Sequence, residues 1–440
     1  MSDRLFTPES LPAAGVGVFS LDEALPRSST LIEASAGTGK TFTLTHLAAN
    51  FIERDAVPIS QLLLVTYTRA AAGELRDRLR RVLRQRAATT TDTDASTRLR
   101  IAAEEFDTAT ITTIHGFCQQ VLTTLGVNVP LDPALKLLAD EETLITQIAA
   151  DLLAGQALAK STAEGTLPKL AKLTEAIRMG STHPGIVVAG HPDEPDHNRL
   201  AQLTTDGLDE LDRRLAARSL MTYQQLLNRV AAAVNGPKNS GVVDILRRRF
   251  RVALIDEFQD TDPVQWEVFR LLFAGGDRAD SPTLVLVGDP KQAIYSFRGA
   301  DIATYLDAKQ VVERQRRLDR NWRSTPQLIA ALNSLFAGSR FGSSPDGTHT
   351  IDYDPVIAAR KHDAAVPGHQ ALKIRSFDMA AYHEVHPPEY RKNGNAVPTP
   401  VGLIRHLVGL DLVSQVRSTL ADGVRAEEIT VLVTSNKDAA

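Results

Sequence analysis

A glycine-rich turn near the start of the chain has the composition of a phosphate-binding loop. Residues 34–41 read ASAGTGKT and directly follow the apolar run STLIEA. Gly37 and Gly39 would let backbone N–H groups close around phosphates, and the start of a following helix would add its partial positive charge. Lys40 would reach the β- and γ-phosphates, and the hydroxyl after it would hold Mg²⁺. The predicted nucleotide-binding residues are Ala34, where glycine usually begins the pattern, Ser35, Ala36, Gly37, Thr38, Gly39, Lys40 and the Mg²⁺ ligand Thr41.

Two acidic residues follow another apolar run in RVALIDEFQDTD (251–262). Asp256 can bind Mg²⁺ through water, while Glu257 is placed to orient or deprotonate an attacking water. One acid at the end of a strand is common on a protein surface. Two acids after a buried strand, in a chain that also has a phosphate loop, predict hydrolysis of a nucleoside triphosphate.

The segment LVLVGDPKQAIYSFRGAD (284–301) combines a polar strand end with aromatic and cationic side chains. Gln292 can reach a γ-phosphate. Tyr295, Phe297 and Arg298 have the composition that stacks single-stranded bases and binds phosphates. Core packing is the alternative for each aromatic taken singly. The segment therefore predicts a contact shared by nucleotide and single-stranded nucleic acid.

Short apolar, β-branched runs alternate along the chain with stretches of helical spacing. This pattern predicts a parallel sheet covered by helices on both faces. Right-handed crossovers would place the loops after the strands along one edge, where ligands bind in open α/β sheets. The sequence thus predicts an α/β fold of the P-loop NTPase type. The expected strands are 29–34, 61–68, 109–114, 251–256 and 283–288, and the expected helices include about 40–54, 69–87 and the region of VQWEVFRLLF.

Between roughly 118 and 225 the strand pattern disappears, and helical spacing predicts a helical insertion. Its middle, 180–198, is rich in Pro and Gly and is predicted to be a loop. His183, His191 and His197 lie there without cysteine partners or helical spacing. We therefore expect a solvated loop in preference to a metal site.

The remaining segments carry weaker patterns. TTTDTDAST (89–97) is expected to be a polar linker, and the tail alternates loops with weak strand signals at 371–377 and 429–433. The chain is therefore expected to end inside an α/β domain. The predicted divisions are a first motor domain over 1–117 and 226–317, the helical insertion over 118–225, and an incomplete second motor domain over 318–440.

Composition limits the class of protein. The 49 Lys and Arg against 53 Asp and Glu give a net charge of −4, so any contact with a polyanion must be local. The arginine-rich stretches 76–86 and 246–249 fit either a solvated helix face or such a contact. The single Cys118 cannot form an internal disulfide, and no signal peptide or apolar run of about 18 residues is visible. We expect a soluble, cytoplasmic protein.

In their order and spacing, these segments resemble the successive motifs of superfamily 1 UvrD-like helicases. The segments that carry the resemblance are ASAGTGKT, LLLVTYTRAAAGELRDRLR, TITTIHGF, LIDEFQDTDPVQW, VGDPKQAIYSFRGADIATYL and LDRNWRS. LIEASAGTGKT, DEFQDTDPVQW and GDPKQAIYSFRGADIATYL are most similar to the RecB-type branch. The resemblance runs from about residue 29 to 336 and continues weakly to the end. It implies two RecA-like motor domains, ATP and Mg²⁺ as cofactors, and DNA as substrate.

The resemblance also implies roles for residues that spacing alone does not assign. Arg323 resembles the arginine finger that meets the γ-phosphate from the second motor domain, and Trp322 stands where an aromatic stacks on adenine. Lys40, Asp256, Glu257, Gln292 and Arg323 then form the expected catalytic set. The implied single-strand contacts are Thr66, Tyr67, Arg69, Thr113, His115, Tyr295, Phe297 and Arg298, with capping or core packing as the alternative for His115.

The implied activity is ATP-driven 3′ to 5′ translocation on single-stranded and duplex DNA. The setting would be double-strand-break repair and recombination, in an exodeoxyribonuclease V complex with RecC-like and RecD-like subunits. The alternatives are a stand-alone UvrD-like or AddA-type helicase, and a catalytically incomplete, ATP-gated DNA-binding fragment.

Two departures from the family pattern bear on these expectations. No glutamine before the phosphate loop matches the one that reads adenine in stand-alone relatives, so base selectivity stays open. The late helicase motifs, the second arginine finger and the nuclease domain have no counterpart in these 440 residues, so we expect a fragment of a longer protein.

Overall fold

The fold is taken from a computed structural model of the chain. It describes residues 16–125, 136–138, 140–158, 166–182, 188–191, 193–235, 240–274, 281–294, 302–343, 350–361, 370–376, 378–385 and 401–434. The chain divides into two units, one of residues 1–324 and 332–360 and the other of residues 325–331 and 361–440. The predicted domain boundaries after residues 117, 225 and 317 stay predictions.

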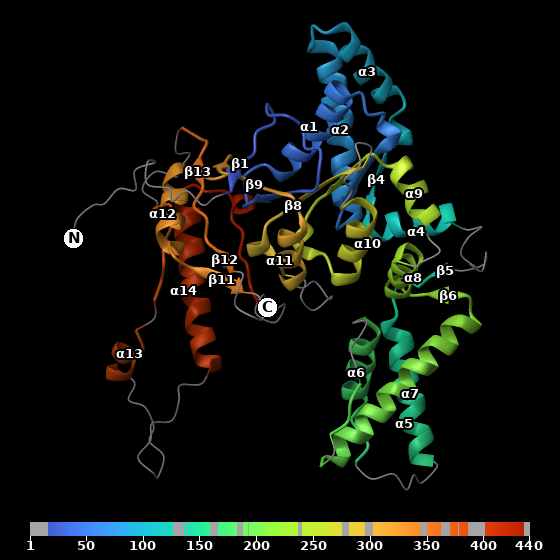
Figure 1. Ribbon diagram of the computed structural model, residues 1–440. Coiled ribbons are helices and arrows are strands. Elements are labelled where there is room, and N and C mark those ends of the chain that lie inside the picture. Colours follow the sequence, from blue (N-terminus) through green and yellow to red (C-terminus); the bar gives the residue numbers. More distant parts are fainter. Residues whose placement is uncertain are drawn as a thin grey trace. The chain divides into compact units, whose positions relative to one another are not determined.

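A sheet forms the centre of the first unit (Figure 1). It has seven strands in the order β1-β9-β2-β8-β7-β3-β4. Every neighbouring pair in it is parallel. The α/β fold with a parallel sheet is therefore confirmed. Its strands are β1 (Gly17–Val18), β2 (Thr30–Ala34), β3 (Leu62–Thr66), β4 (Thr110–Thr113), β7 (Val252–Ile255), β8 (Thr283–Gly288) and β9 (Arg314–Leu318).

Strand residues alternate between two hydrophobic cores, one on each face of the sheet. On β2, Leu31 belongs to one core and Ile32 to the other, and Leu284 and Val285 alternate in the same way on β8. Because both faces are covered, the central strands are apolar at nearly every position. One core is covered by α1 (Lys40–Asp55), α2 (Arg69–Thr89) and α3 (Thr93–Glu104), and the other by α4 (Ile114–Leu125), α8 (Tyr223–Asn235), α9 (Ser240–Arg249), α10 (Pro263–Phe273) and α11 (Ile302–Val311).

Side-chain caps fix where several helices begin. The hydroxyl of Thr68 accepts from the N–H of Ala71 at the start of α2. The carboxylate of Asp92 accepts from two backbone N–H groups at the start of α3. The expected linker over 89–97 was therefore wrong in its second half, because a polar Asp at this position satisfies the free donors of a helix end.

Three helices between β5 and β6 form a separate hydrophobic cluster within the first unit (Figure 1). They are α5 (Glu142–Leu158), α6 (Leu170–Thr182) and α7 (Pro195–Ala217), while β5 (Lys136–Leu137) pairs with β6 (Leu220–Met221). The predicted loop over 180–198 was too long at both ends, because α6 continues to Thr182 and α7 begins at Pro195. Proline suits the first turn of a helix, since its missing N–H would have no partner there.

The histidines of this region form no metal cluster within the described part of the chain. His191 and His197 are exposed and lie beside Glu194, with His197 Nδ1 at 2.6 Å from Glu194 Oε2. His183 lies outside the described residues.

The two predicted strands of the tail were wrong. Residues 371–376 and 429–433 form no strand, and Leu432 is 92% exposed. A strand needs a neighbour for its backbone groups, and the described residues of the second unit offer none. The described residues of this unit instead include α13 (Met379–Val385) and the long helix α14 (Val401–Ala421).

The remaining elements are β10 (Arg320–Asn321) paired with β13 (Ile357–Ala358), β11 (Arg340–Ser343) paired with β12 (Thr350–Asp352), and α12 (Pro326–Phe336). Among the described helices, none has the length and apolar character to cross a membrane.

Two helical glycines of the insertion predict opposite effects on stability. A Cβ at Gly207 on α7 would lie 2.4 Å from the buried Ile177 Cδ1, whereas a Cβ at Gly155 on α5 would meet nothing within 4 Å. Gly207→Ala should therefore lower the free energy of unfolding by about 1 kcal/mol or more through overpacking. Gly155→Ala should raise it by about 0.5–1 kcal/mol through helix propensity. Chemical denaturation of both variants measures the difference, and equal shifts would contradict the close packing of α6 on α7.

Candidate nucleotide-binding site

The glycine-rich turn joins β2 to α1 at the carboxyl edge of the sheet. Gly37 has φ +78° and Gly39 has φ +91°, both in the left-handed region that glycine adopts without a steric penalty. The hydroxyl and the N–H of Thr38 both bond the carbonyl of Ser35, at 2.7 and 3.2 Å. Helix α1 begins at Lys40 directly after this turn. The turn thus places free N–H groups of a helix start where an anion would be stabilised.

Lys40 forms an ion pair with Glu257 across the sheet edge. Lys40 Nζ lies 2.8 Å from Glu257 Oε2, and the lysine side chain is only 12% exposed. Glu257 follows β7 and has φ +51°, an uncommon conformation for a residue other than glycine. Such backbone conformations persist only where surrounding contacts enforce them, and they gather at functional sites. The pair joins the two residues predicted to bind phosphate and to activate water.

Asp256 is 7% exposed and accepts a hydrogen bond from the N–H of Glu257 at 3.0 Å. Burial raises the pKa of the Asp256 carboxyl to about 7, the negative charge of Glu257 raises it as well, and Lys40 opposes both. A buried carboxylate with so little compensation is stabilised by a hard cation, for which carboxylate and hydroxyl oxygens are the preferred ligands. The donor chemistry of Asp256 and Thr41 therefore fits Mg²⁺.

The end of β8 lies beside this ion pair. Gln259 donates from Nε2 to Glu257 Oε2 at 2.7 Å, and its Oε1 accepts from the N–H of Asp289 at 2.9 Å. The Asp289 carboxylate in turn binds Lys291 Nζ at 2.8 Å and Gln292 Nε2 at 2.6 Å. Gln292 thus begins a short connected network that reaches Lys40.

The segment after β10 lies against the glycine-rich turn. The N–H of Trp322 donates to the carbonyl of Gly37, and Asn321 Nδ2 donates to the carbonyl of Ala36, both at 2.8 Å. Asn321 Oδ1 accepts from the N–H of Arg323 at 2.9 Å. A Cβ at Gly37 would come within 2.9 Å of the Arg323 Cβ. The structure therefore brings Trp322 and Arg323 to the phosphate loop through bonds to its carbonyls, which leave its N–H groups available.

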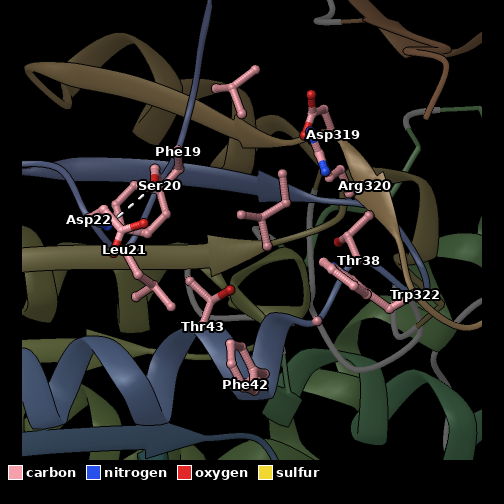
Figure 2. A pocket seen from close by; sticks show the side chains of 13 residues that line it. Phe19, Ser20, Leu21, Asp22, Thr38, Phe42, Thr43, Asp319, Arg320 and Trp322 are labelled. Atoms are coloured by element: carbon pink, nitrogen blue, oxygen red, sulfur yellow. Dashed lines mark hydrogen bonds between the residues drawn. The ribbon is translucent and has the colours of Figure 1, made fainter. Parts of the chain in front are cut away.

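A cavity of about 950 Å³ opens next to the turn (Figure 2). Phe42 and Trp322 both line it, and their side chains are 54% and 59% exposed. A Cβ on Gly39 would lie 3.8 Å from Phe42 and 4.0 Å from Trp322, so both aromatics lie beside that residue. The Phe42 ring stacks on His46 with centroids 3.9 Å apart. The other lining residues are Val18, Phe19, Ser20, Leu21, Asp22, Thr38, Gly39, Thr43, Leu318, Asp319 and Arg320.

A second cavity, of about 310 Å³, lies where the core meets the helical insertion. Tyr67, His115 and Tyr223 line it, and the His115 and Tyr223 rings meet edge to face with centroids 4.6 Å apart. Burial lowers the pKa of His115, which favours the neutral ring. Asp260 and Glu141 also line the cavity, and burial raises the pKa of both, for Asp260 to about 6.

Comparison with known proteins identifies the family. The model of the UvrD/REP helicase N-terminal domain matches residues 22–313. The chain belongs to the UvrD/REP helicase family. Membership implies the use of a nucleotide and magnesium in general.

Several bacterial RecB proteins are similar to this helicase chain. The "RecBCD enzyme subunit RecB" of Mycolicibacterium smegmatis is 34% identical over 94% of this chain and 38% of its own length. That of Mycobacterium tuberculosis H37Rv is 32% identical over 96% of this chain and 40% of its own length. That of Escherichia coli K12 is 27% identical over 76% of this chain and 40% of its own length. The chain therefore spans about two fifths of these curated relatives.

The helicase motifs occupy different parts of the first unit. The phosphate loop, Asp256, Glu257 and Gln292 lie along one sheet edge, with Trp322 and Arg323 against the turn. Tyr67 and His115 line the second cavity instead. Thr66 is fully buried at the end of β3, Thr113 accepts from the N–H of Gly116, and Arg69 begins α2. Tyr295, Phe297 and Arg298 lie outside the described residues, and the roles of all these residues stay predictions.

Sequence reasoning missed three residues of these sites. Phe42 follows the phosphate loop in GKTF, and a large aromatic on the exposed start of a helix was a usable signal. Gln259 sits two residues after Glu257, but nothing local shows that its amide reaches β8. Tyr223 is 156 residues from Tyr67 in sequence, so only the fold brings the two to one cavity.

The Asp256 carboxyl predicts a pH-dependent stability in metal-free buffer. Its pKa is about 7 in the folded protein and near 3.8 when unfolded, so the folded state binds the extra proton between these values. The free energy of unfolding should therefore fall as pH rises from about 4 to about 7. Asp256→Asn should remove on the order of 2–3 kcal/mol of the loss between pH 5 and pH 8. Urea denaturation in EDTA measures both proteins, and equal pH dependence would contradict the burial of this charge.

Proposed function

We propose that this chain contains the ATP-hydrolysing motor of a RecB-type DNA helicase. The ion pair of Lys40 with Glu257, beside the buried Asp256, is the observation that supports hydrolysis most directly. It holds a phosphate-binding cation next to a carboxylate that can accept a proton from water. The family match and the RecB relatives support DNA as the substrate on which the hydrolysis acts.

In this proposal Lys40 exchanges one anionic partner for another. Its ammonium group is bound to Glu257 in the described arrangement, and a γ-phosphate at the turn would compete for it. Glu257 is then released to accept a proton from the attacking water. Thr41 and Asp256 would hold Mg²⁺, which neutralises phosphate charge when bound. Arg323 would add a second cation from the segment that lies on the turn.

Phe42 and Trp322 are proposed to hold the adenine ring. Two exposed aromatics beside the turn offer flat apolar surface to a base while its phosphates reach the loop. Ser20 and Asp22 line the same cavity, where the expected glutamine has no match in the sequence. The adenine ring would thus be held mainly by stacking on these two aromatics, and not by hydrogen bonds to a glutamine side chain.

The second cavity is proposed to take bases of single-stranded DNA. Tyr67, His115 and Tyr223 supply ring faces and edges, and stacking on aromatics is worth about 1–3 kcal/mol per base. Asp260, Asp262 and Glu141 repel phosphates but can accept hydrogen bonds from exocyclic amino groups of bases, and Arg178, which also lines the cavity, is ion-paired with Glu175. The cavity therefore suits a base better than a backbone phosphate. Arg69, Thr113, Tyr295, Phe297 and Arg298 are proposed as further DNA contacts on their motif positions alone, whereas Thr66 has no exposed surface with which to contact DNA.

The wider setting is proposed from the relatives. The RecB proteins of several bacteria carry the name of a RecBCD enzyme subunit, which supports a role in recombination with RecC-like and RecD-like partners. These matches favour the RecB branch over a stand-alone UvrD-like or AddA-type helicase. Translocation from 3′ to 5′ on single-stranded and duplex DNA follows from the same resemblance.

Two substitutions test the phosphate-binding cation and the proposed base. Lys40→Ala should lower ATP hydrolysis by about 100-fold or more, because a preorganised cation at the phosphates is lost. Glu257→Gln keeps the shape but cannot accept a proton, so turnover should fall by about 100-fold or more. Steady-state phosphate release by the full-length protein, with and without single-stranded DNA, measures both. Wild-type turnover in Lys40→Ala would remove the nucleotide-site assignment, and wild-type turnover in Glu257→Gln would remove its role as the base.

Tyr223 tests the second cavity. Tyr223→Ala should weaken binding of a short single-stranded oligonucleotide by about 1–3 kcal/mol, while nucleotide affinity stays unchanged. Tyr223→Phe keeps the ring and should bind DNA like the wild type. Fluorescence anisotropy at fixed salt gives the affinities. Unchanged DNA binding by folded Tyr223→Ala would place the DNA path elsewhere.

A further inference from the structure

Gln259 connects the ends of two strands, β7 and β8, whose following residues are proposed to take part in nucleotide hydrolysis. Its side chain is 3% exposed, and both polar ends are bonded. Nε2 donates to Glu257 Oε2 at 2.7 Å, and Oε1 accepts from the N–H of Asp289 at 2.9 Å. Since the nitrogen can only donate and the oxygen can only accept, these partners fix one orientation of the amide.

The surrounding backbone is shaped around this side chain. Gly288 is the last residue of β8, and a Cβ there would come within 2.8 Å of Gln259 Oε1. The same Cβ would lie 3.2 Å from the backbone nitrogens of Phe258 and Gln259. Phe258 is fully buried against Trp266 and Tyr305, which anchors the short turn that carries Gln259. Gln259 therefore cannot move aside without disturbing the core.

Hydrogen bonds through Gln259 run from the phosphate loop to the end of β8. Lys40 binds Glu257, Glu257 accepts from Gln259, and Gln259 accepts from Asp289, which holds Gln292. Glu257 Oε2 is shared between Lys40 and Gln259. When Lys40 turns to a phosphate, the donor that remains on this oxygen is Gln259.

We propose that Gln259 is a positioning residue that holds Glu257 in place for water activation and ties its position to the segment 289–294. This proposal rests on the ATPase function proposed above. Gln259 itself need not touch nucleotide. Its loss should lower turnover while leaving nucleotide affinity nearly unchanged. Because 289–294 leads into the predicted DNA contacts at 295–298, the stimulation of turnover by single-stranded DNA should fall as well.

The chain offers a closely matched control. Gln225 Nε2 donates to the Asp212 carboxylate at 2.7 Å, and Gln225 Oε1 accepts from the N–H of Thr222 at 3.1 Å. This is the bonding pattern of Gln259, placed on α8 beside the second cavity and not at the phosphate loop. Gln259→Glu and Gln225→Glu each replace an amide donor by a second carboxylate next to an existing one. Only the first change affects a residue that is proposed to activate water.

The experiment compares wild type, Gln259→Glu, Gln225→Glu and Lys40→Ala in the full-length protein. A fluorescent ATP analogue gives nucleotide affinity, and phosphate release gives kcat and KM with and without a single-stranded oligonucleotide. Gln259→Glu should lose about tenfold or more in kcat and most of the DNA stimulation, with affinity within about threefold of wild type. Gln225→Glu should keep the DNA-free kcat and KM of the wild type.

Some results would contradict the positioning role of Gln259, and another would contradict the ATPase function on which it rests. Wild-type kcat and DNA stimulation in Gln259→Glu would overturn the positioning role, and so would an equal loss of DNA-free kcat in Gln225→Glu. Wild-type turnover in Lys40→Ala would instead contradict the proposed ATPase function itself. If Gln259→Glu does not fold, Gly288→Ala gives the second test, because its Cβ displaces Gln259 Oε1. A folded Gly288→Ala with wild-type kcat would then contradict the proposal.

Discussion

The ion pair between Lys40 and Glu257 is the interaction on which the arrangement of the site depends. The two residues are 217 positions apart, and their side chains meet at 2.8 Å. Their contact requires β2 and β7 to end at the same sheet edge with only β8 between them. Glu257 accepts a left-handed backbone conformation to reach this place. With Lys40 12% and Glu257 34% exposed, the pair keeps a cation and a carboxylate together until a phosphate can replace one of them.

The rest of the first unit can be understood as support for that edge. Apolar residues on both faces of the central strands fix the sheet between two helical layers, so the strand ends cannot shift independently. Two glycines lie where the backbone comes close to a side chain of another segment. Gly37 lies next to Arg323, and Gly288 lies next to Gln259. Asn321 holds the segment of Trp322 on the carbonyl side of the turn. Each contact positions a charged or aromatic group without occupying the N–H groups of the turn.

The sequence predicted the local parts of this arrangement well. The turn 34–41, the acidic pair after β7 and five of the seven strands of the sheet each carry a pattern that lies within a few residues. Strand β9 was missed because RQRRL is basic, and its strand conformation comes from pairing with β2 and β1. Helix α14 was missed since its apolar residues do not gather on one face. The hydrogen bonds of Gln259, and the presence of Tyr67 and Tyr223 in one cavity, depend on tertiary contacts that no local pattern encodes.

Nucleotide affinity of Glu257→Gln tests the central claim most directly. If Glu257 competes with phosphate for Lys40, removing its charge should tighten binding of ATP in the absence of Mg²⁺ by about 3- to 30-fold, equivalent to about 0.7–2 kcal/mol. Titration of a fluorescent ATP analogue into wild type and variant gives the two dissociation constants. Tighter binding by the variant is the expected result. Equal or weaker binding would show that the Lys40–Glu257 pair does not compete with nucleotide, and would contradict the account.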